Sequence, residues 1–376
     1  DVCSSDLLNK SENQMFQVSE TVESNDVAMM LYTSGTTGNK KGVQISYGNL
    51  QAVVSYVIEF MEIDSTINEY IIAPINHAFG FVRCCSVLEA GGTLVFDDGV
   101  FNPAKVILTL KQKKCNAISS ISSGFALMIE HYESFFKSVG TQIKWIEIGS
   151  MPLDVKYKIK LLELLPNAKV VMNFGLTEAM RSTLFDLRAH PKKLNTVGQA
   201  SPGIEISIKD PDGKELSAGE VGVIYIKGAN VANGFWKQKQ FQGYVCTGDF
   251  GVLDKDGFLT FLGRKDDIIN TGGNSFSPVE VEQHFFSLLN GISFCICGTP
   301  DPLGILGEIP VLCVEGQSIP LPEKLTEQVQ SMLNDFKIPK KIYFFDSIPK
   351  THNGKIKRSM LKDYIATEQY LTSRDL

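Results

Sequence analysis

The chain is organised around the stretch Leu31-Tyr32-Thr33-Ser34-Gly35-Thr36-Thr37-Gly38-Asn39-Lys40-Lys41-Gly42. Apolar residues 27–32 lead into it and predict a buried strand, and a helical pattern over Asn49 to Met61 follows. Glycines permit close backbone approach, N–H groups and hydroxyls can face one anion, and lysines add positive charge. The lysine spacing differs from that of a P-loop. The stretch predicts an anion-binding loop, and a plain polar loop is the alternative that it leaves open by itself.

Length and composition predict a globular protein of two or three domains. The chain has 376 residues, of which 43% are hydrophobic and 21% are charged. Its net charge of -6 argues against a nucleic-acid partner. No apolar run approaches the ~18 residues that a membrane-spanning helix needs, so we expect no integral membrane segment.

The cysteines form no C-x-x-C pair, and most of them lie inside apolar runs. This arrangement predicts reduced core residues rather than disulfides or zinc ligands, and it indicates a cytoplasmic protein. The cysteines are Cys3, Cys84, Cys85, Cys115, Cys246, Cys295, Cys297 and Cys313.

The first residues of the chain, Asp1 to Leu7, contain no initiator methionine and no signal-peptide pattern. They resemble the translation of a common sequencing adapter, so we expect residues 1–7 to be an artefact and exclude them from the fold prediction. Resequencing the locus tests this expectation, which continuous coding sequence through these residues would contradict.

From residue 26 onward, short apolar strands alternate with helical patterns. This alternation predicts an α/β fold with a mostly parallel sheet covered on both faces. Ligands of such sheets gather at the carboxyl ends of strands, so the loop after Thr33 and the segment after Asn173 are expected to face one crevice. The predicted strands are 69–75, 93–96, 116–121, 143–148 and 169–174, and the helices are 79–89, 103–113, 124–132 and 153–165.

The pattern changes after about His190. Short strands separated by turn signals at 210–213, 218–220 and 254–257 predict an antiparallel, barrel-like β subdomain. From Arg264 the chain mixes helices and strands, which predicts a small, mobile C-terminal α+β domain. We therefore expect an α/β part at 8–191, a β-rich part at 192–264 and the C-terminal domain at 265–376.

Four further segments carry chemically versatile side chains. Each segment, taken alone, also has an ordinary structural explanation. In the order in which the segments are given below, these explanations are a strand end with a helix cap, a turn, a basic surface loop and a capping histidine. The segments are Asn173-Phe174-Gly175-Leu176-Thr177-Glu178, Thr247-Gly248-Asp249 with Gly263-Arg264-Lys265-Asp266, Pro349-Lys350-Thr351-His352-Asn353-Gly354-Lys355-Ile356-Lys357-Arg358, and Pro74-Ile75-Asn76-His77-Ala78-Phe79-Gly80.

Together with the first loop, and in their order along the chain, these segments resemble the signature motifs of the adenylate-forming enzymes. This superfamily includes acyl- and aryl-CoA synthetases, luciferases and the adenylation domains of peptide synthetases. The resemblance extends from about Asp26 to Leu361, with Lys40 in place of a usual proline and Asn270 in place of a common lysine. Such enzymes carry a longer segment before the phosphate loop. We therefore expect an N-terminal portion to be missing and this chain alone to be poorly soluble or inactive.

The resemblance implies that the first loop binds the phosphates of ATP and that the second segment holds adenine and a metal ion. Phe174 would stack on adenine and Asn173 would help read its edge, next to Gly175. Thr177 would contact the α-phosphate and Glu178 would hold Mg²⁺, a hard cation that favours carboxylate oxygen. The phosphate-binding residues would be Thr33, Ser34, Gly35, Thr36, Thr37, Gly38 and Lys41.

The resemblance also implies roles for the ribose site and the C-terminal domain. Asp249 would accept hydrogen bonds from the ribose hydroxyls, and Arg264 would donate to ribose or phosphate. Asp266 would be the hinge between the large and small domains. Lys355 would reach the reacting carboxylate and the bridging phosphate oxygen.

The acid site is expected near His77 and the 149–153 segment, which fits the family's G-x-x-P-L pattern. Relatives that activate amino acids place an aspartate near His77 to bind the amine, whereas this chain has Asn-His-Ala-Phe-Gly. That difference favours an acid without an amine. Arg181, just past Glu178, is either a contact for a substrate anion or a surface charge.

The resemblance implies a two-step reaction. A small-molecule carboxylic acid would react with ATP and Mg²⁺ to give acyl-AMP and pyrophosphate, and coenzyme A would then displace AMP to form a thioester. An acyl carrier protein as the thiol partner is one alternative, and an inactive truncated fragment is another. The intact loop at Thr33–Gly38, with Glu178, Asp249 and Lys355, argues against decay by substitution.

Overall fold

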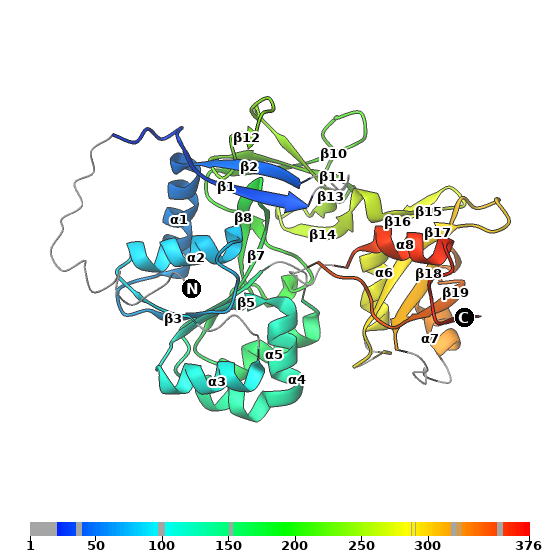
Figure 1. Ribbon diagram of the computed structural model, residues 1–376, viewed down its shortest axis with the longest axis horizontal. Helices are drawn as coiled ribbons and strands as arrows, with labels where there is room; N and C mark the ends of the chain where they lie inside the picture. Colours follow the sequence, from blue (N-terminus) through cyan, green and yellow to red (C-terminus); the bar gives the residue numbers. More distant parts are fainter. Residues whose placement is uncertain are drawn as a thin grey trace, which may run out of the picture.

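The computed structural model describes residues 21–34, 40–96, 102–149, 153–286, 288–289, 291–316, 322, 325–351 and 356–376. It shows a larger body, built from the chain up to Arg264, beside a smaller C-terminal body (Figure 1). Their apolar cores are separate, since the core of the larger body ends at Leu259 and the next begins at Ile269. The boundaries at residues 191 and 264 stay predictions.

A seven-stranded sheet forms the centre of the larger body, in the order β4-β3-β5-β6-β7-β8-β9. The first five strands of that order are parallel, and β8 and β9 are antiparallel. The predicted α/β fold with a mostly parallel sheet is confirmed. The strands are β3 Asn68–Ile71, β4 Thr93–Val95, β5 Ala117–Ile121, β6 Trp145–Gly149, β7 Lys169–Leu176, β8 Ala179–Asp186 and β9 Gln199–Ala200.

Helices cover both faces of this sheet. Helices α1 and α2 pack together on one side, and α3, α4 and α5 pack in a row on the other (Figure 1). Each helix buries an apolar stripe, as an amphipathic helix over a sheet does. Their bounds are α1 Tyr47–Met61, α2 Ala78–Glu89, α3 Pro103–Gln112, α4 Ser122–Val139 and α5 Val155–Leu164.

The strand predicted before the first motif loop is present, but the prediction that it is buried is wrong. Strand β1, Val27–Ser34, pairs antiparallel with β2, Lys40–Ser46, and β12, Gly234–Phe235, completes a separate three-stranded sheet. In this sheet β1 is an edge strand, with β2 as its partner. Met29 and Leu31 pack only partly against the core, and Tyr32 is 62% exposed.

The following β section is antiparallel, in the order β10-β11-β13-β14. Two of the predicted turns join its strands, and both Gly213 and Gly257 adopt the positive φ that such turns require. The sheet is open: in the described part of the chain β10 and β14 do not pair, so no closed barrel forms. The strands are β10 Ile204–Lys209, β11 Gly222–Gly228, β13 Val245–Leu253 and β14 Leu259–Arg264.

The C-terminal body is a small α+β unit, as predicted from its mixed pattern. Strands β17-β18-β19-β20 form its main sheet, in which β18 and β19 are parallel, and β15 pairs with β16. Its elements are β15 Ile269–Thr271, β16 Asn274–Phe276, α6 Pro278–Phe285, β17 Phe294–Pro300, β18 Glu308–Glu315, α7 Leu325–Met332, β19 Lys341–Phe345, α8 Arg358–Ala366 and β20 Thr372–Asp375.

The sequence also predicted that the chain has no membrane-spanning helix and that its cysteines are reduced. None of the described helices is long and apolar enough to cross a membrane. The cysteines of the described ranges are free thiols; Cys115, Cys295, Cys297 and Cys313 are buried and Cys246 is exposed. Cys3 lies outside the described residues.

Candidate active site

The second motif forms the hairpin between β7 and β8. Thr177 and Glu178 are its turn residues, and a strand follows them, so the alternative of a helix cap is wrong. At Gly175 the neighbouring backbone approaches closely, since an added Cβ would lie 2.6 Å from the backbone nitrogen of Arg181. The motif therefore needs glycine for steric reasons, and the turn directs Glu178 out of the central sheet.

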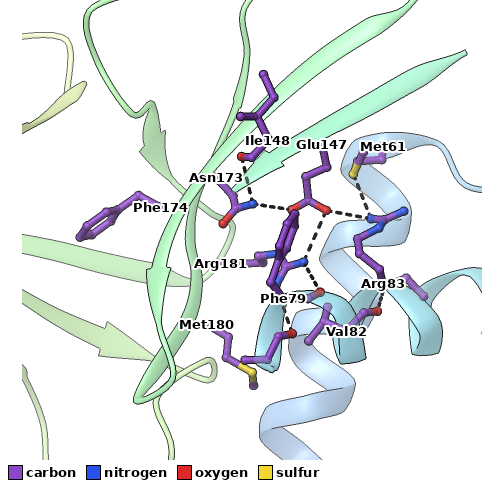
Figure 2. Close-up of polar contacts among 12 residues, drawn as sticks. Met61, Phe79, Val82, Arg83, Glu147, Ile148, Asn173, Phe174, Met180 and Arg181 are labelled. Atoms are coloured by element: carbon purple, nitrogen blue, oxygen red, sulfur yellow. Dashed lines mark hydrogen bonds and ion pairs between the residues drawn. The ribbon is translucent and has the colours of Figure 1, made fainter. Parts of the chain in front are cut away.

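The two residues that precede this glycine have well-defined surroundings. Phe174 is partly buried, and its ring centroid lies 5.7 Å from that of Phe261. The Asn173 side chain turns the other way, and its Nδ2 donates to Glu147 Oε1 at 2.7 Å and to the Ile148 carbonyl at 3.3 Å (Figure 2). The two side chains therefore point to different sides of the end of β7.

The third motif places Asp249 and Arg264 opposite each other on β13 and β14. Arg264 Nε lies 2.9 Å from Asp249 Oδ1, and Arg264 Nη1 donates to the Thr247 carbonyl at 3.2 Å. The Asp249 side chain is 6% exposed and that of Arg264 is 42% exposed. The pair thus presents a buried acceptor and an accessible donor at one edge of the sheet.

An open cavity of about 400 Å³ joins these motifs. It brings Glu178 of the β7–β8 turn together with Thr247 and Arg264 of the β section. Lys41 of the first motif contacts Phe235 in the wall of this cavity, since its Nζ lies 5.2 Å from the centre of that ring. The lining residues are Leu176, Glu178, Phe235, Gln240, Phe241, Gln242, Tyr244, Val245, Cys246, Thr247 and Arg264.

Part of the predicted phosphate site lies outside the described residues. Thr33 pairs with Lys41 across the β1–β2 hairpin, and Ser34 ends β1. The residues of the connecting loop are outside the description, and so is Lys355 with its neighbours in the fourth motif. The undescribed site residues are Gly35, Thr36, Thr37, Gly38 and Lys355.

The ends of the fourth motif are well anchored. Lys350 and Ile356, on either side of the undescribed residues 352–355, form an isolated antiparallel bridge. The buried Arg358 then pairs with Glu282 at 2.6 Å and with Asp267 at 3.3 Å. Because Asp267 follows the predicted hinge residue, the motif is tied directly to the connection between the two bodies.

His77 and Asp266 lie at the ends of elements. His77 is partly exposed immediately before α2. Phe79, in the first turn of that helix, lies against Gly149, where an added Cβ would meet the Phe79 ring at 3.0 Å. Asp266 is exposed in a short 3-10 turn between β14 and β15, at the connection between the separate cores.

A buried charged network behind the hairpin was missed by sequence reasoning. Arg83 pairs with Glu69 at 3.1 Å. Glu147 pairs with Arg83 at 3.2 Å and with Arg181 at 2.8 Å (Figure 2). All four residues are at most 3% exposed, so Arg181 is not a surface charge. The available signal was a charged residue inside each of two apolar patterns, the 143–148 strand and the 79–89 helix.

The network balances two cationic against two acidic side chains. Burial lowers the pKa of Arg83, but the Glu69 and Glu147 carboxylates outweigh burial and raise it. Its guanidinium also lies 4.3 Å from the centre of the Trp145 ring. A balanced set of this kind is costly to break by removing one member, because the remaining partner stays buried without its counter-charge.

The cavity fits a metal ion that a nucleotide brings with it. Among the described residues, no group of three or more His, Cys, Asp or Glu is arranged to hold an ion by itself. A Mg²⁺ ion bound to phosphates keeps several waters and needs only one or two protein carboxylates. Glu178 at the cavity wall is a suitable ligand of that kind.

The chain belongs to the AMP-binding enzyme family, whose model matches residues 2–236. The model of the AMP-binding enzyme C-terminal domain matches residues 280–355. Feruloyl-CoA synthase of Amycolatopsis sp is 28% identical, over 88% of this chain and 68% of its own length. Oxalate–CoA ligase of Saccharomyces cerevisiae is 29% identical, over 91% of this chain and 64% of its own length.

Solved structures show the same fold. ATP-bound MatB from Rhodopseudomonas palustris has a TM-score of 0.81 at 27% identity, with 91% of this chain and 69% of that chain covered. The o-succinylbenzoate coenzyme A synthetase MenE from Bacillus subtilis, in complex with ATP and magnesium ion, has a TM-score of 0.82 at 25% identity, with 95% and 74% covered.

These relatives confirm the predicted superfamily and the class of enzyme, an acid-thiol ligase of the coenzyme A synthetase type. They do not favour an acyl carrier protein as the thiol partner. The chain spans between 64% and 68% of the length of the two relatives named above.

Proposed function

We propose that the protein activates a carboxylic acid with ATP and transfers the acyl group to coenzyme A. The observation that carries this proposal is the cavity that joins Glu178, Thr247 and Arg264, next to the buried Asp249. Glu178 and the Asp249–Arg264 pair come from distant parts of the sequence. Glu178 supplies a carboxylate suited to a phosphate-bound metal ion, and the pair supplies an acceptor and a donor suited to ribose and phosphate. Their convergence supports one nucleotide site.

In the first half-reaction, a carboxylate oxygen of the acid attacks the α-phosphorus of ATP. A new P–O bond forms, the bond to the β-phosphate bridge breaks, and pyrophosphate leaves with the electron pair. Asp249 holds the ribose hydroxyls, Phe174 holds the adenine face, and Thr177 donates to the α-phosphate. Positioning and charge stabilisation supply the catalysis, as is usual in phosphoryl-type transfer.

Glu178 would hold the Mg²⁺ ion, which supplies positive charge to the phosphate oxygens. Thr33, Lys41 and the loop between their strands then bind the β- and γ-phosphates. The β1–β2 hairpin contacts the cavity wall through Lys41 and Phe235. That position supports a phosphate-binding role for the hairpin.

In the second half-reaction, the sulfur of coenzyme A attacks the acyl carbon and AMP leaves with the former carboxylate oxygen. Lys355 stabilises charge during the first step, and rotation about Asp266 moves it away before the second. The exposed position of Asp266 between two separate cores supports a hinge. A small-molecule acid without an amine is the substrate class that the His77 segment favours.

The proposal is tested by titrating the chain with ATP in the presence of Mg²⁺. The titration uses the 376-residue chain and the same chain with any coding sequence found upstream of residue 1. A saturable one-to-one complex is expected in at least one of them, and absence of binding in both would refute the nucleotide site. Pyrophosphate release is then measured over short, medium and aromatic acids. This second assay uses the 376-residue chain and the same chain with any coding sequence found upstream of residue 1. Release that is independent of added acid in every sample would contradict acid activation.

A further inference from the structure

Glu147 occupies the centre of the buried network behind the β7–β8 hairpin. Its Oε1 accepts hydrogen bonds from Asn173 Nδ2 at 2.7 Å and from Arg181 Nε at 2.8 Å, and its Oε2 lies 3.2 Å from Arg83 Nη1. Glu147 is completely buried. No solvent therefore competes for these contacts, and the carboxylate determines which groups can face it.

A carboxylate accepts hydrogen bonds and cannot donate them. The Asn173 amide must therefore turn its NH₂ end toward Glu147, and the second N–H of that group points to the Ile148 carbonyl at 3.3 Å. Figure 2 shows the amide oxygen of Asn173 on the side away from Glu147. The free end of the amide is thus an acceptor.

Arg181 holds this arrangement in place from the neighbouring strand. Its Nη2 donates to the Phe79 carbonyl at 3.0 Å as well as facing Glu147, and its own carbonyl accepts from Ser201 Oγ at 2.8 Å. Its φ of 48° is unusual for a residue other than glycine, and such strain persists only where surrounding contacts enforce it. These contacts occupy the guanidinium, which argues against a direct contact with a substrate anion.

We propose that Glu147, supported by Arg181, is a positioning residue that fixes the Asn173 amide as an acceptor toward the base. A purine with a 6-amino group donates to such an acceptor, whereas a 6-oxo group presents a second acceptor and is repelled. The buried pair therefore selects ATP over ITP. This inference rests on the proposed function, with Asn173 beside the adenine edge as the resemblance to the adenylate-forming enzymes implies.

The test measures the ratio of ATP to ITP affinities by competition binding, in the parent chain and in the Glu147→Gln variant. A glutamine amide can donate to the Asn173 oxygen, which allows the Asn173 amide to turn its NH₂ end toward the base. We expect the preference for ATP over ITP to fall about tenfold, the effect of one hydrogen bond of this kind. Glu69→Gln is the matched control, because it removes a buried carboxylate that pairs with Arg83 and does not contact Asn173.

Glu69→Gln is expected to lose thermal stability but to keep the parent's preference for ATP. If Glu147→Gln alone does not fold, Glu147→Gln combined with Arg181→Met keeps the buried charges balanced and is expected to lose the preference in the same way. An unchanged ATP-to-ITP ratio in either folded variant, or an equal loss in Glu69→Gln, overturns the inference. If the parent chain binds neither nucleotide, the proposed function fails first and the inference falls with it.

Discussion

Arg264 and Asp249 lie directly opposite each other on β14 and β13, with the Arg264 Nε 2.9 Å from the Asp249 carboxylate. The carboxylate is almost fully buried, whereas the guanidinium is partly accessible from the cavity. A bound ribose would therefore share the Asp249 carboxylate with Arg264 and need not displace it, since an ionised carboxylate can accept several hydrogen bonds. A substitution of Asp249 should therefore change the affinity for the nucleotide directly.

Asp249→Asn should weaken ATP binding by about 10- to 100-fold, because charge-assisted hydrogen bonds to the ribose are lost. Equilibrium titration with ATP and Mg²⁺ measures the effect. Asp254→Asn is the control: this residue lies in the turn of the same β13–β14 hairpin, where it pairs with Lys193. Equal affinities in Asp249→Asn and the parent would remove Asp249 from the site.

The exposed thiol of Cys246 is a native probe of the cavity. It lines the cavity, while burial raises the pKa of Cys84 and of Cys115 to about 11 and makes those thiols poorly reactive. ATP with Mg²⁺ should slow alkylation of Cys246 by N-ethylmaleimide several-fold, as followed by peptide mass spectrometry. Cys246→Ser identifies the labelled peptide, and labelling at one rate with and without ATP would place the nucleotide elsewhere.

Lys158 should make stability depend on alkaline pH. Burial lowers its pKa to about 8 in the folded protein, with Asp154 acting in the opposite direction. Between about pH 8 and the unfolded value near 10.4, the unfolded chain binds more protons, so the free energy of unfolding rises with pH. The full rise amounts to about 3 kcal/mol, and it is complete only above the unfolded pKa.

Chemical denaturation of Lys158→Met at pH 7.5 and pH 10 checks this prediction, because the variant should lack that rise. Lys156→Met changes an exposed lysine on the same helix and is expected to retain the parent's pH dependence. Parallel curves for the parent and Lys158→Met would show that the buried ammonium contributes nothing to the pH dependence.

The sequence predicted the central sheet well because its strands are continuous apolar runs between amphipathic helices, a local pattern. For β1 it predicted the strand but not its exposure, because this strand lies at the edge of a separate small sheet. That outcome depends on pairing with β2 and β12, which no local pattern encodes. The helix cap considered for Thr177 and Glu178 failed similarly, because pairing of β8 with β7 decided the structure.

For the candidate site, too, local motifs could be predicted from the sequence and contacts between distant strands could not. Motif order identified Glu178, Thr247 and Arg264, which the fold gathers around one cavity. Glu147 and Arg181 were not identified as partners, because their contact joins β6 to β8 across the sheet. A buried charge inside an apolar strand signals a partner, but only the fold specifies which residue it is.

Adenylation itself is tested most directly by isotope transfer, in the 376-residue chain and in the same chain with any coding sequence found upstream of residue 1. An acid labelled with ¹⁸O in its carboxylate is incubated with ATP, Mg²⁺ and coenzyme A, and the nucleotide products are examined by mass spectrometry. Attack on the α-phosphorus predicts one ¹⁸O atom in AMP, and Lys355→Ala should bind ATP but form little labelled AMP. Label in inorganic phosphate together with ADP would contradict the account, because it would show attack on the γ-phosphorus instead.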